Sequence, residues 1–234
     1  PDLFFYYKPL SKNPVSRLGH EFHDRPGRDF FERAARVLQM HPDSLAHRAY
    51  VYGFLCHFAL DTLSHDYVAE KEAASGLSHA RIESELERAL MLRDGLDPAS
   101  HRPTGHLVPS EENAAVIADF FPEVTQEQVL DSLRGMVFYL DLLVAPSALK
   151  RWVIFTALRL AGQFEKLGGL VVGPDPEPRC EDSNAELLRR FDRAAELAAR
   201  LIGDFDRVVE SGQAEDPIYG RTFDPKPEQE AANA

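Results

Sequence analysis

The sequence contains only two cysteines, Cys56 and Cys180, and no apolar run long enough to cross a bilayer. Two cysteines are too few for a disulfide framework, so we expect both to be free thiols. A membrane-spanning helix needs about 20 apolar residues, and a secretory leader needs a charged segment followed by an apolar one; we expect neither here. Together with the unpaired cysteines, these absences favour a cytoplasmic protein.

Positive charge is also scarce. The chain has 26 Lys and Arg residues against 38 Asp and Glu residues, which gives a formal net charge of −12. Nucleic-acid grooves are lined with Lys and Arg because phosphate repels an acidic surface, so no such groove is expected. A small phosphate-containing substrate is still compatible with this charge, because bound metal cations reverse the local potential.

Alternating strand patterns and internal repeats are absent, and segments with helical spacing dominate. This pattern predicts an all-α fold, with one multi-helix domain over residues 1–212 around a long central helix. The predicted helices cover residues 29–40, 45–72, 79–93, 109–121, 125–144, 147–164 and 182–210. The Gly- and Pro-rich residues 168–179 predict a loop, and the polar residues 213–234 predict a poorly ordered tail.

The central predicted helix is apolar around much of its circumference, which is typical of a buried helix. Its segment CHFALDTLSH nevertheless carries His57, Asp61 and His65 at intervals of four residues. Side chains at this interval stack one turn apart, about 5–6 Å between Cβ atoms, so the three polar groups share one helical face. His79 and Glu83 repeat the interval on the next predicted helix.

This spacing suits joint binding of a cation, because imidazole and carboxylate are usual zinc ligands. A lone histidine is more often a hydrogen-bonded core residue, and one His-x-x-x-Asp pair is common by chance. Two such pairs with a histidine between them favour metal binding, since burying so many polar groups without a cation would cost about 1–3 kcal/mol for each unsatisfied group. Further donors precede them: Asp2, and, in GHEFHD, His20, His23 and Asp24.

The remaining histidines lack this spacing, and we expect them at the surface. They are His41, His47, His101 and His106. The aromatic run FFYY at residues 4–7 is expected to pack in the core. The alternative is that these rings form a wall of the metal cleft, because aromatic faces bind quaternary ammonium groups.

Seven donor residues occur in an order that is found in a known family. They are Asp2, His23, His57, Asp61, His65, His79 and Glu83. In this order and spacing they resemble the ligands of the bacterial zinc-dependent phospholipase C family, whose helical architecture and metal cluster also occur in zinc-dependent single-strand nucleases. The segment YVYGFLCHFALDTLSHDY is similar to the central helix of non-secreted bacterial members, and the motif-bearing part covers residues 1–90.

The resemblance implies two or three zinc ions and assigns the ligands. The first ion would take Asp2, His23, His57 and Asp61. The second would take His65, His79 and Glu83. A third would share Asp61, and its other ligands are expected upstream of Pro1. His20 is an alternative to His23, which is preferred because it follows Phe22 in a family-like Gly-x-x-apolar-His arrangement.

The resemblance also implies the chemistry. We expect a zinc-dependent phosphodiester hydrolase, phospholipase C-like, that acts on a phospholipid headgroup or a related small phosphodiester. Zinc lowers the pKa of bound water from roughly 15.7 towards 7. Asp2 is implied both as a ligand and as the catalytic base for the water. Glu21, Asp24 and Asp66 are candidates for holding imidazole N–H groups in the correct tautomer.

Several alternatives stay open at this point. A single-strand nuclease of the same superfamily would use the same ligands, and manganese or iron would also fit nitrogen and oxygen donors. A non-catalytic helical binding module with structural metals is a different class, although a site with three protein ligands leaves a position for water and favours catalysis. An HD-domain phosphohydrolase would use adjacent pairs such as His23-Asp24 or His65-Asp66. Transient contact with a membrane surface is possible for a lipid-cleaving enzyme, and the sequence does not determine the oligomeric state.

Overall fold

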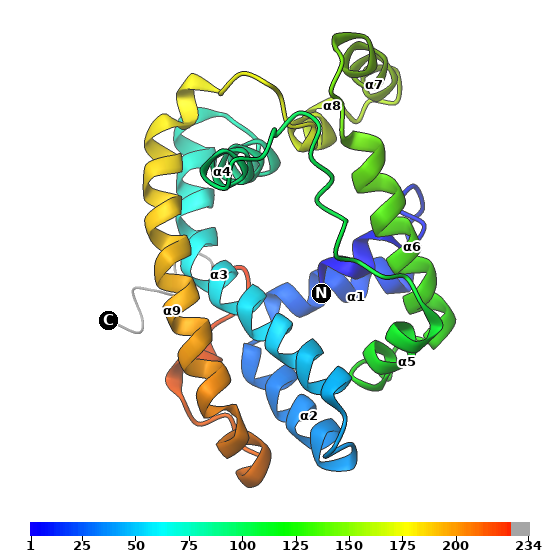
Figure 1. Ribbon diagram of the computed structural model, residues 1–234, viewed down its shortest axis with the longest axis vertical. Helices are drawn as coiled ribbons and strands as arrows, with labels where there is room; N and C mark the ends of the chain where they lie inside the picture. Colours follow the sequence, from blue (N-terminus) through cyan, green and yellow to red (C-terminus); the bar gives the residue numbers. More distant parts are fainter. Residues whose placement is uncertain (226–234) are drawn as a thin grey trace. The chain divides into compact units, whose positions relative to one another are not determined.

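The computed structural model describes residues 1–225 and, within them, every side chain except that of Lys166. The α-helices are α1 (Pro14–Asp24), α2 (Gly27–Met40), α3 (Leu45–Ser75), α4 (His79–Arg93), α5 (Glu111–Asp119), α6 (Gln126–Leu143), α7 (Ala148–Leu160), α8 (Phe164–Leu167) and α9 (Glu181–Ser211) (Figure 1). Short 3-10 helices are η1 (Asp2–Tyr6), η2 (Gly168–Leu170), η3 (Pro178–Cys180) and η4 (Pro217–Gly220). No β-strand occurs in residues 1–225, so the predicted all-α class is confirmed.

The chain folds as two compact units. Unit 1 comprises Pro1–His65, Leu107–Val137 and Asp192–Ala234. Unit 2 comprises Asp66–His106 and Phe138–Phe191. The boundary falls within α3, α6 and α9, so His65 is the last residue of α3 that belongs to unit 1.

Local signals explain where several helices begin. Thr125 and Gln128 form the predicted capping box: each backbone N–H donates to the other side chain, at 2.9 and 3.2 Å. Helix α1 is not among the predicted helices, although its start carries a clear signature. Asn13 accepts a hydrogen bond from the backbone N–H of Ser16 at 2.9 Å, and Pro14 occupies the first helical position.

Aromatic rings form much of the unit 1 core. Phe30 of α2 stacks on Phe54 of α3 with ring centroids 3.6 Å apart. Phe4 of η1 is fully buried and meets Phe121 edge to face at 4.9 Å. The expected core position of the FFYY run is therefore correct for Phe4. The Phe30–Phe54 contact fixes α2 against the central helix, which carries three of the predicted metal donors, and the Phe4–Phe121 contact fixes η1 against the segment after α5.

The prediction of a poorly ordered tail over residues 213–234 is wrong for residues 213–225. Within residues 213–225, Tyr219 and Phe223 are only 2% and 1% exposed and pack in the unit 1 core. Two buried rings outweigh the polar, Pro-containing composition on which the prediction rested, because each aromatic side chain buries a large apolar area. The rest of the predicted tail, residues 226–234, lies outside the described residues.

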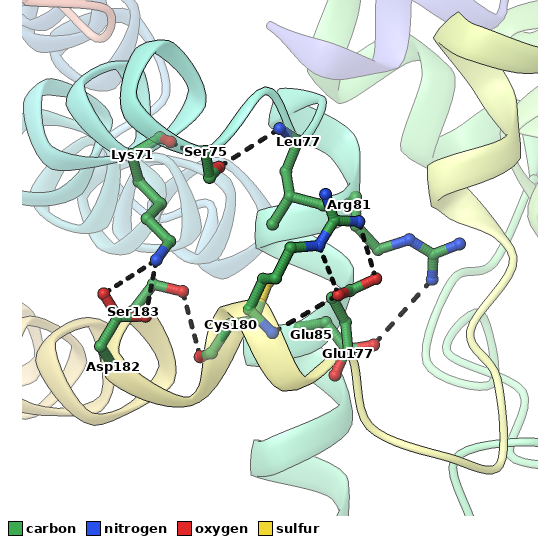
Figure 2. Close-up of polar contacts among 10 residues, drawn as sticks. Lys71, Ser75, Leu77, Arg81, Glu85, Glu177, Cys180, Asp182 and Ser183 are labelled. Atoms are coloured by element: carbon green, nitrogen blue, oxygen red, sulfur yellow. Dashed lines mark hydrogen bonds and ion pairs between the residues drawn. The ribbon is translucent and has the colours of Figure 1, made fainter.

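Unit 2 has its own small core, formed by Val68, Leu77, Ile82, Leu86, Cys180 and Leu187. Polar contacts surround it, as Figure 2 shows: Lys71 Nζ lies 2.6 Å from an Asp182 carboxylate oxygen, and the Ser183 hydroxyl donates to the Cys180 carbonyl at 3.1 Å. Both cysteines are free thiols, as predicted; Cys56 is exposed and Cys180 is buried.

No single helix of the described chain is long and apolar enough to cross a membrane. Helices α6 and α7 together pass that test of length and composition, but they are bent by 120° relative to each other.

Candidate metal centre

Four of the predicted donors meet in unit 1. Asp2 comes from η1, His23 from α1, and His57 and Asp61 from α3. His23 Nε2 lies 2.9 Å from Asp2 Oδ1, and His57 Nε2 lies 3.7 Å from Asp2 Oδ2. One donor atom from each of Asp2, His23 and His57 lies within 4.8 Å of the other two. Residues far apart in the sequence therefore present nitrogen and oxygen atoms to a common point.

Helix α3 presents its polar face as the four-residue spacing predicted. Asp61 Oδ2 lies 3.1 Å from His57 Nε2, and Asp61 Oδ1 lies 3.8 Å from His65 Nε2. The two oxygens of one carboxylate thus face two different imidazoles. This is the arrangement in which a carboxylate can serve two neighbouring cations.

The α1 backbone fixes the orientation of His23. Its Nδ1 lies 2.7 Å from the Gly19 carbonyl oxygen, which can only accept, so Nδ1 carries the hydrogen and Nε2 faces the site. Phe5 packs over this region, with its ring 5.4 Å from the His23 ring. A Cβ on residue 19 would lie 2.8 Å from Phe5 Cε1, so glycine permits this close approach. The Gly-x-x-apolar-His pattern noted in the sequence therefore has a steric reason.

The exposed His20 does not take the place of His23. Its ring lies against Phe5 at 4.6 Å, and His23 is the residue in contact with Asp2. Phe5 therefore packs beside both imidazoles of α1. This placement corresponds to the alternative prediction for the FFYY run, as a wall beside the donors.

Burial and pairing shift the ionisation of the donors in opposite directions. Burial lowers the pKa of His57 and raises the pKa of Asp61. For Asp2, desolvation opposes ionisation, but the charge of His57 and the hydrogen bond from His23 outweigh it and lower the pKa. For His23, burial is likewise outweighed by the hydrogen bond to Asp2, which raises the pKa. Metal binding requires ionised carboxylates and neutral imidazoles, so the lowered pKa values of Asp2 and His57 favour it, whereas the raised pKa values of His23 and Asp61 oppose it.

A divalent cation fits this donor set. His57 Nε2 and Asp61 Oδ2 are buried and lie 3.1 Å apart, yet neither atom has a hydrogen-bond partner among residues 1–225. Buried polar atoms without partners cost about 1–3 kcal/mol each. Ligands at roughly 2.0–2.2 Å from a tetrahedral zinc lie about 3.3–3.6 Å apart. The observed 2.9, 3.1 and 3.7 Å contacts bracket that range.

Sequence reasoning missed Asp224. Its Oδ1 lies 3.9 Å from His65 Nδ1, and its backbone N–H donates to the His23 carbonyl at 3.2 Å. Asp224 lies in the predicted tail, with no helical spacing to link it to either histidine. Asp224 therefore lies beside an imidazole, where the sequence predicted Glu21, Asp24 or Asp66.

Two of those carboxylates are held elsewhere, which corrects their predicted role. Glu21 Oε2 lies 3.2 Å from Arg25, and Asp66 Oδ1 lies 2.6 Å from Arg190. The guanidinium groups of Arg25 and Arg190 bind these carboxylate oxygens in place of imidazole N–H groups. The position of a carboxylate next to a histidine in the sequence does not indicate which cation it will pair with.

The last two predicted donors form a pair in unit 2. His79 Nε2 lies 3.1 Å from Glu83 Oε1, one turn apart on α4, and both side chains are partly exposed. Their spacing along the helix is therefore as expected. His65 belongs to unit 1, so the second ligand set of His65, His79 and Glu83 stays a prediction from the sequence.

A separate cluster corrects the surface assignment of His47, which is buried. His47 Nε2 lies 3.0 Å from Asp119 Oδ2, its Nδ1 lies 2.6 Å from the Ser44 hydroxyl, and its ring stacks on His41 at 4.3 Å. The two rings are parallel to within 8°, so their in-plane lone pairs do not converge on one ion. We interpret this cluster as a structural junction of α2, α3 and α5.

Comparisons of this chain with protein-family models, curated proteins and solved structures find no match.

Proposed function

We propose that this protein is a zinc-dependent hydrolase of phosphodiester bonds, phospholipase C-like in its chemistry. The observation that carries the proposal is the convergence of Asp2, His23 and His57, whose donor atoms lie within 4.8 Å of one another. The adjacent Asp61 carboxylate, with its two oxygens turned towards different imidazoles, adds support. Asp2, His23, His57 and Asp61 would hold the first ion.

When bound, zinc supplies Lewis acidity towards phosphoryl oxygens and lowers the pKa of water towards 7. Asp2 is the residue suited to accept a proton in the reaction. Its side chain is 45% exposed at the site, and the family resemblance implies this role. His23 orients that carboxylate through the 2.9 Å contact, while the Gly19 carbonyl holds the opposite side of the imidazole ring.

The second ligand set would come from His65, His79 and Glu83, as the family resemblance implies. Its support is the spacing on two helices and the 3.1 Å contact between His79 and Glu83. The proposal therefore includes at least two ions. Contacts among Asp2, His23, His57 and Asp61 support the first, and the His79–Glu83 contact supports the second.

The HD-domain alternative is less favoured, because an HD site needs the aspartate of an adjacent pair as a ligand. Asp66, which follows His65, instead forms an ion pair with Arg190 at 2.6 Å, and both side chains are largely buried. Such a pair is costly to break, since separation would leave a buried charge without a partner.

The test begins with two matched variants on one helix. His23→Ala removes a proposed ligand, whereas His20→Ala removes an exposed imidazole one turn away on α1. Zinc content is measured by elemental analysis, and hydrolysis of bis(p-nitrophenyl) phosphate is followed before and after chelation. We expect zinc in the wild type and in His20→Ala, and loss of zinc and turnover in His23→Ala. Zinc-free protein that is folded and turns over at the wild-type rate would refute the proposal.

The substrate arm compares a phosphatidylcholine analogue with single-stranded DNA. The proposal expects faster turnover of the lipid analogue, because the acidic chain offers no electrostatic support for a polynucleotide. Preference for DNA would assign the same centre to a single-strand nuclease.

A further inference from the structure

Helix α7 of unit 2 carries large apolar side chains in contact with solvent. Leu149, Trp152, Val153 and Leu160 are 71%, 63%, 51% and 86% exposed, and no residue of the helix is fully buried. Isolated exposed apolar residues are ordinary, but contiguous patches mark interaction surfaces.

These four side chains share one face. At 100° per residue they fall within an arc of about 100° around the helix axis. Ile154 and Phe155 point away from that arc and are only partly exposed. Phe155 lies against Phe164 of α8, with ring centroids 5.4 Å apart. Helix α7 is therefore apolar both on the side that contacts α8 and on much of the side that is exposed to solvent.

The charges of this segment are all of one sign. Residues 142–163 contain Lys150, Arg151 and Arg159 and no acidic residue, although the whole chain carries a net charge of −12. On the helix, Lys150 and Arg159 flank the apolar arc on opposite sides. Basic side chains at the edges of an apolar stripe can extend towards phosphate groups while their stems lie along apolar surface.

The contacts of these cations are to backbone carbonyl oxygens and an aromatic ring: the Arg159 guanidinium lies 4.2 Å from the Phe164 ring centroid. Lys150 Nζ donates to the Val144 carbonyl at 2.5 Å, and Arg151 donates to the Ala145 carbonyl at 2.9 Å. The nearby carboxylate of Asp141 is hydrogen-bonded by Arg102 and Thr104, and these contacts, with the charge of Lys150 adding less, lower its pKa.

We propose that the exposed face of α7, formed by Leu149, Trp152, Val153 and Leu160, docks on the surface of an anionic lipid bilayer. Charge complementarity selects this occupant: an isologous contact between two copies would place three cations against three cations. The helix has 13 residues, too few to cross a bilayer, so docking would place it along the interface. Trp152 suits this position, because its ring is amphipathic. This inference goes beyond the hydrolase proposal and does not depend on the metal centre.

The single tryptophan of the chain provides the measurement. Trp152 fluorescence is recorded as the full chain is titrated with phosphatidylcholine vesicles, with and without phosphatidylglycerol. We expect a blue shift with the anionic vesicles that weakens at high salt, because salt screens the attraction between Lys or Arg and lipid phosphate.

Two matched variants locate the docking face. Leu149→Glu places a carboxylate in the first turn of α7, where the helix dipole tolerates it, and should weaken vesicle partitioning at least about tenfold. Leu45→Glu makes the same change in the first turn of α3, at a side chain that is 81% exposed, and should leave partitioning unchanged. Circular dichroism checks that both variants fold.

Three results would overturn the inference. The first is the absence of a Trp152 shift with anionic vesicles. The second is equal loss of binding in Leu149→Glu and Leu45→Glu. The third is a dimer in light scattering that Leu149→Glu dissociates, which would assign the face to a second copy of the chain.

Discussion

The buried ring of Phe223 allows a direct test of how residues 213–225 are held. This side chain is 1% exposed, and its ring centroid lies 4.9 Å from Phe58, 5.5 Å from Phe54 and 5.6 Å from His57. Replacing it with alanine removes the ring that packs residues 213–225 against the central helix. The sequence pattern, which predicted a poorly ordered tail, would make the same substitution neutral.

The expected loss follows from the size of the ring. Phe→Ala substitutions at fully buried positions lower the free energy of unfolding by about 3–5 kcal/mol, the lost transfer energy plus the cavity. A domain with a total stability of about 5–15 kcal/mol usually survives such a loss. For a chain of this size it corresponds to a fall in melting temperature of roughly 6–20 °C.

Urea unfolding of Phe223→Ala, followed by circular dichroism, measures the loss. Phe138→Ala is the matched control, because the Phe138 side chain is 62% exposed and its removal should change stability by no more than about 0.5 kcal/mol. A difference between Phe223→Ala and wild type below about 1 kcal/mol would refute the packing argument. Because the Phe223 ring also lies against His57, the variant should bind zinc more weakly if the metal-centre proposal holds.

Two further predictions concern glycine and cysteine. A Cβ on Gly135 of α6 would clash with a backbone carbonyl oxygen of η1, whereas Gly203 of α9 has open space. Gly135→Ala should therefore lower the free energy of unfolding measured in urea, and Gly203→Ala should raise it by about 0.4–1 kcal/mol. A stabilised Gly135→Ala would contradict the packing of η1. The buried Cys180, whose pKa is raised by burial, stays a protonated and unreactive thiol as pH rises past the ordinary cysteine range, while Cys56 is exposed. Ellman's reagent should modify Cys56 rapidly and Cys180 only after unfolding, and rapid modification of both thiols in native protein would contradict this placement.

Much of the helical structure could be predicted because it depends on neighbours in the sequence. The Thr125 capping box follows from interactions within one turn. Helix α1 was missed although its apolar residues Val15, Leu18 and Phe22 have helical spacing, and its Asn13-Pro14 start was a second signal.

In the candidate site, too, contacts within one helix were predictable and contacts between helices were not. The contact of Asp61 with His57 and His65 was predictable, because four residues on an α-helix always bring side chains to one face. The burial of His47 was not, because its partner Asp119 lies on another helix and the pairing depends on how α3 packs against α5.

By itself, the sequence determined the all-α class, the placement of most helix ends and the polar stripe on α3, since each depends on rotation of about 100° per residue and on groups one turn apart. The family resemblance led us to expect that Asp2 and His23 meet His57, but only the tertiary structure brings these residues together, and only it shows that Phe223 and Asp224 return to the central helix. Those contacts depend on which aromatic surfaces of η1, α1 and α3 are buried against one another, and a local pattern holds no record of that choice.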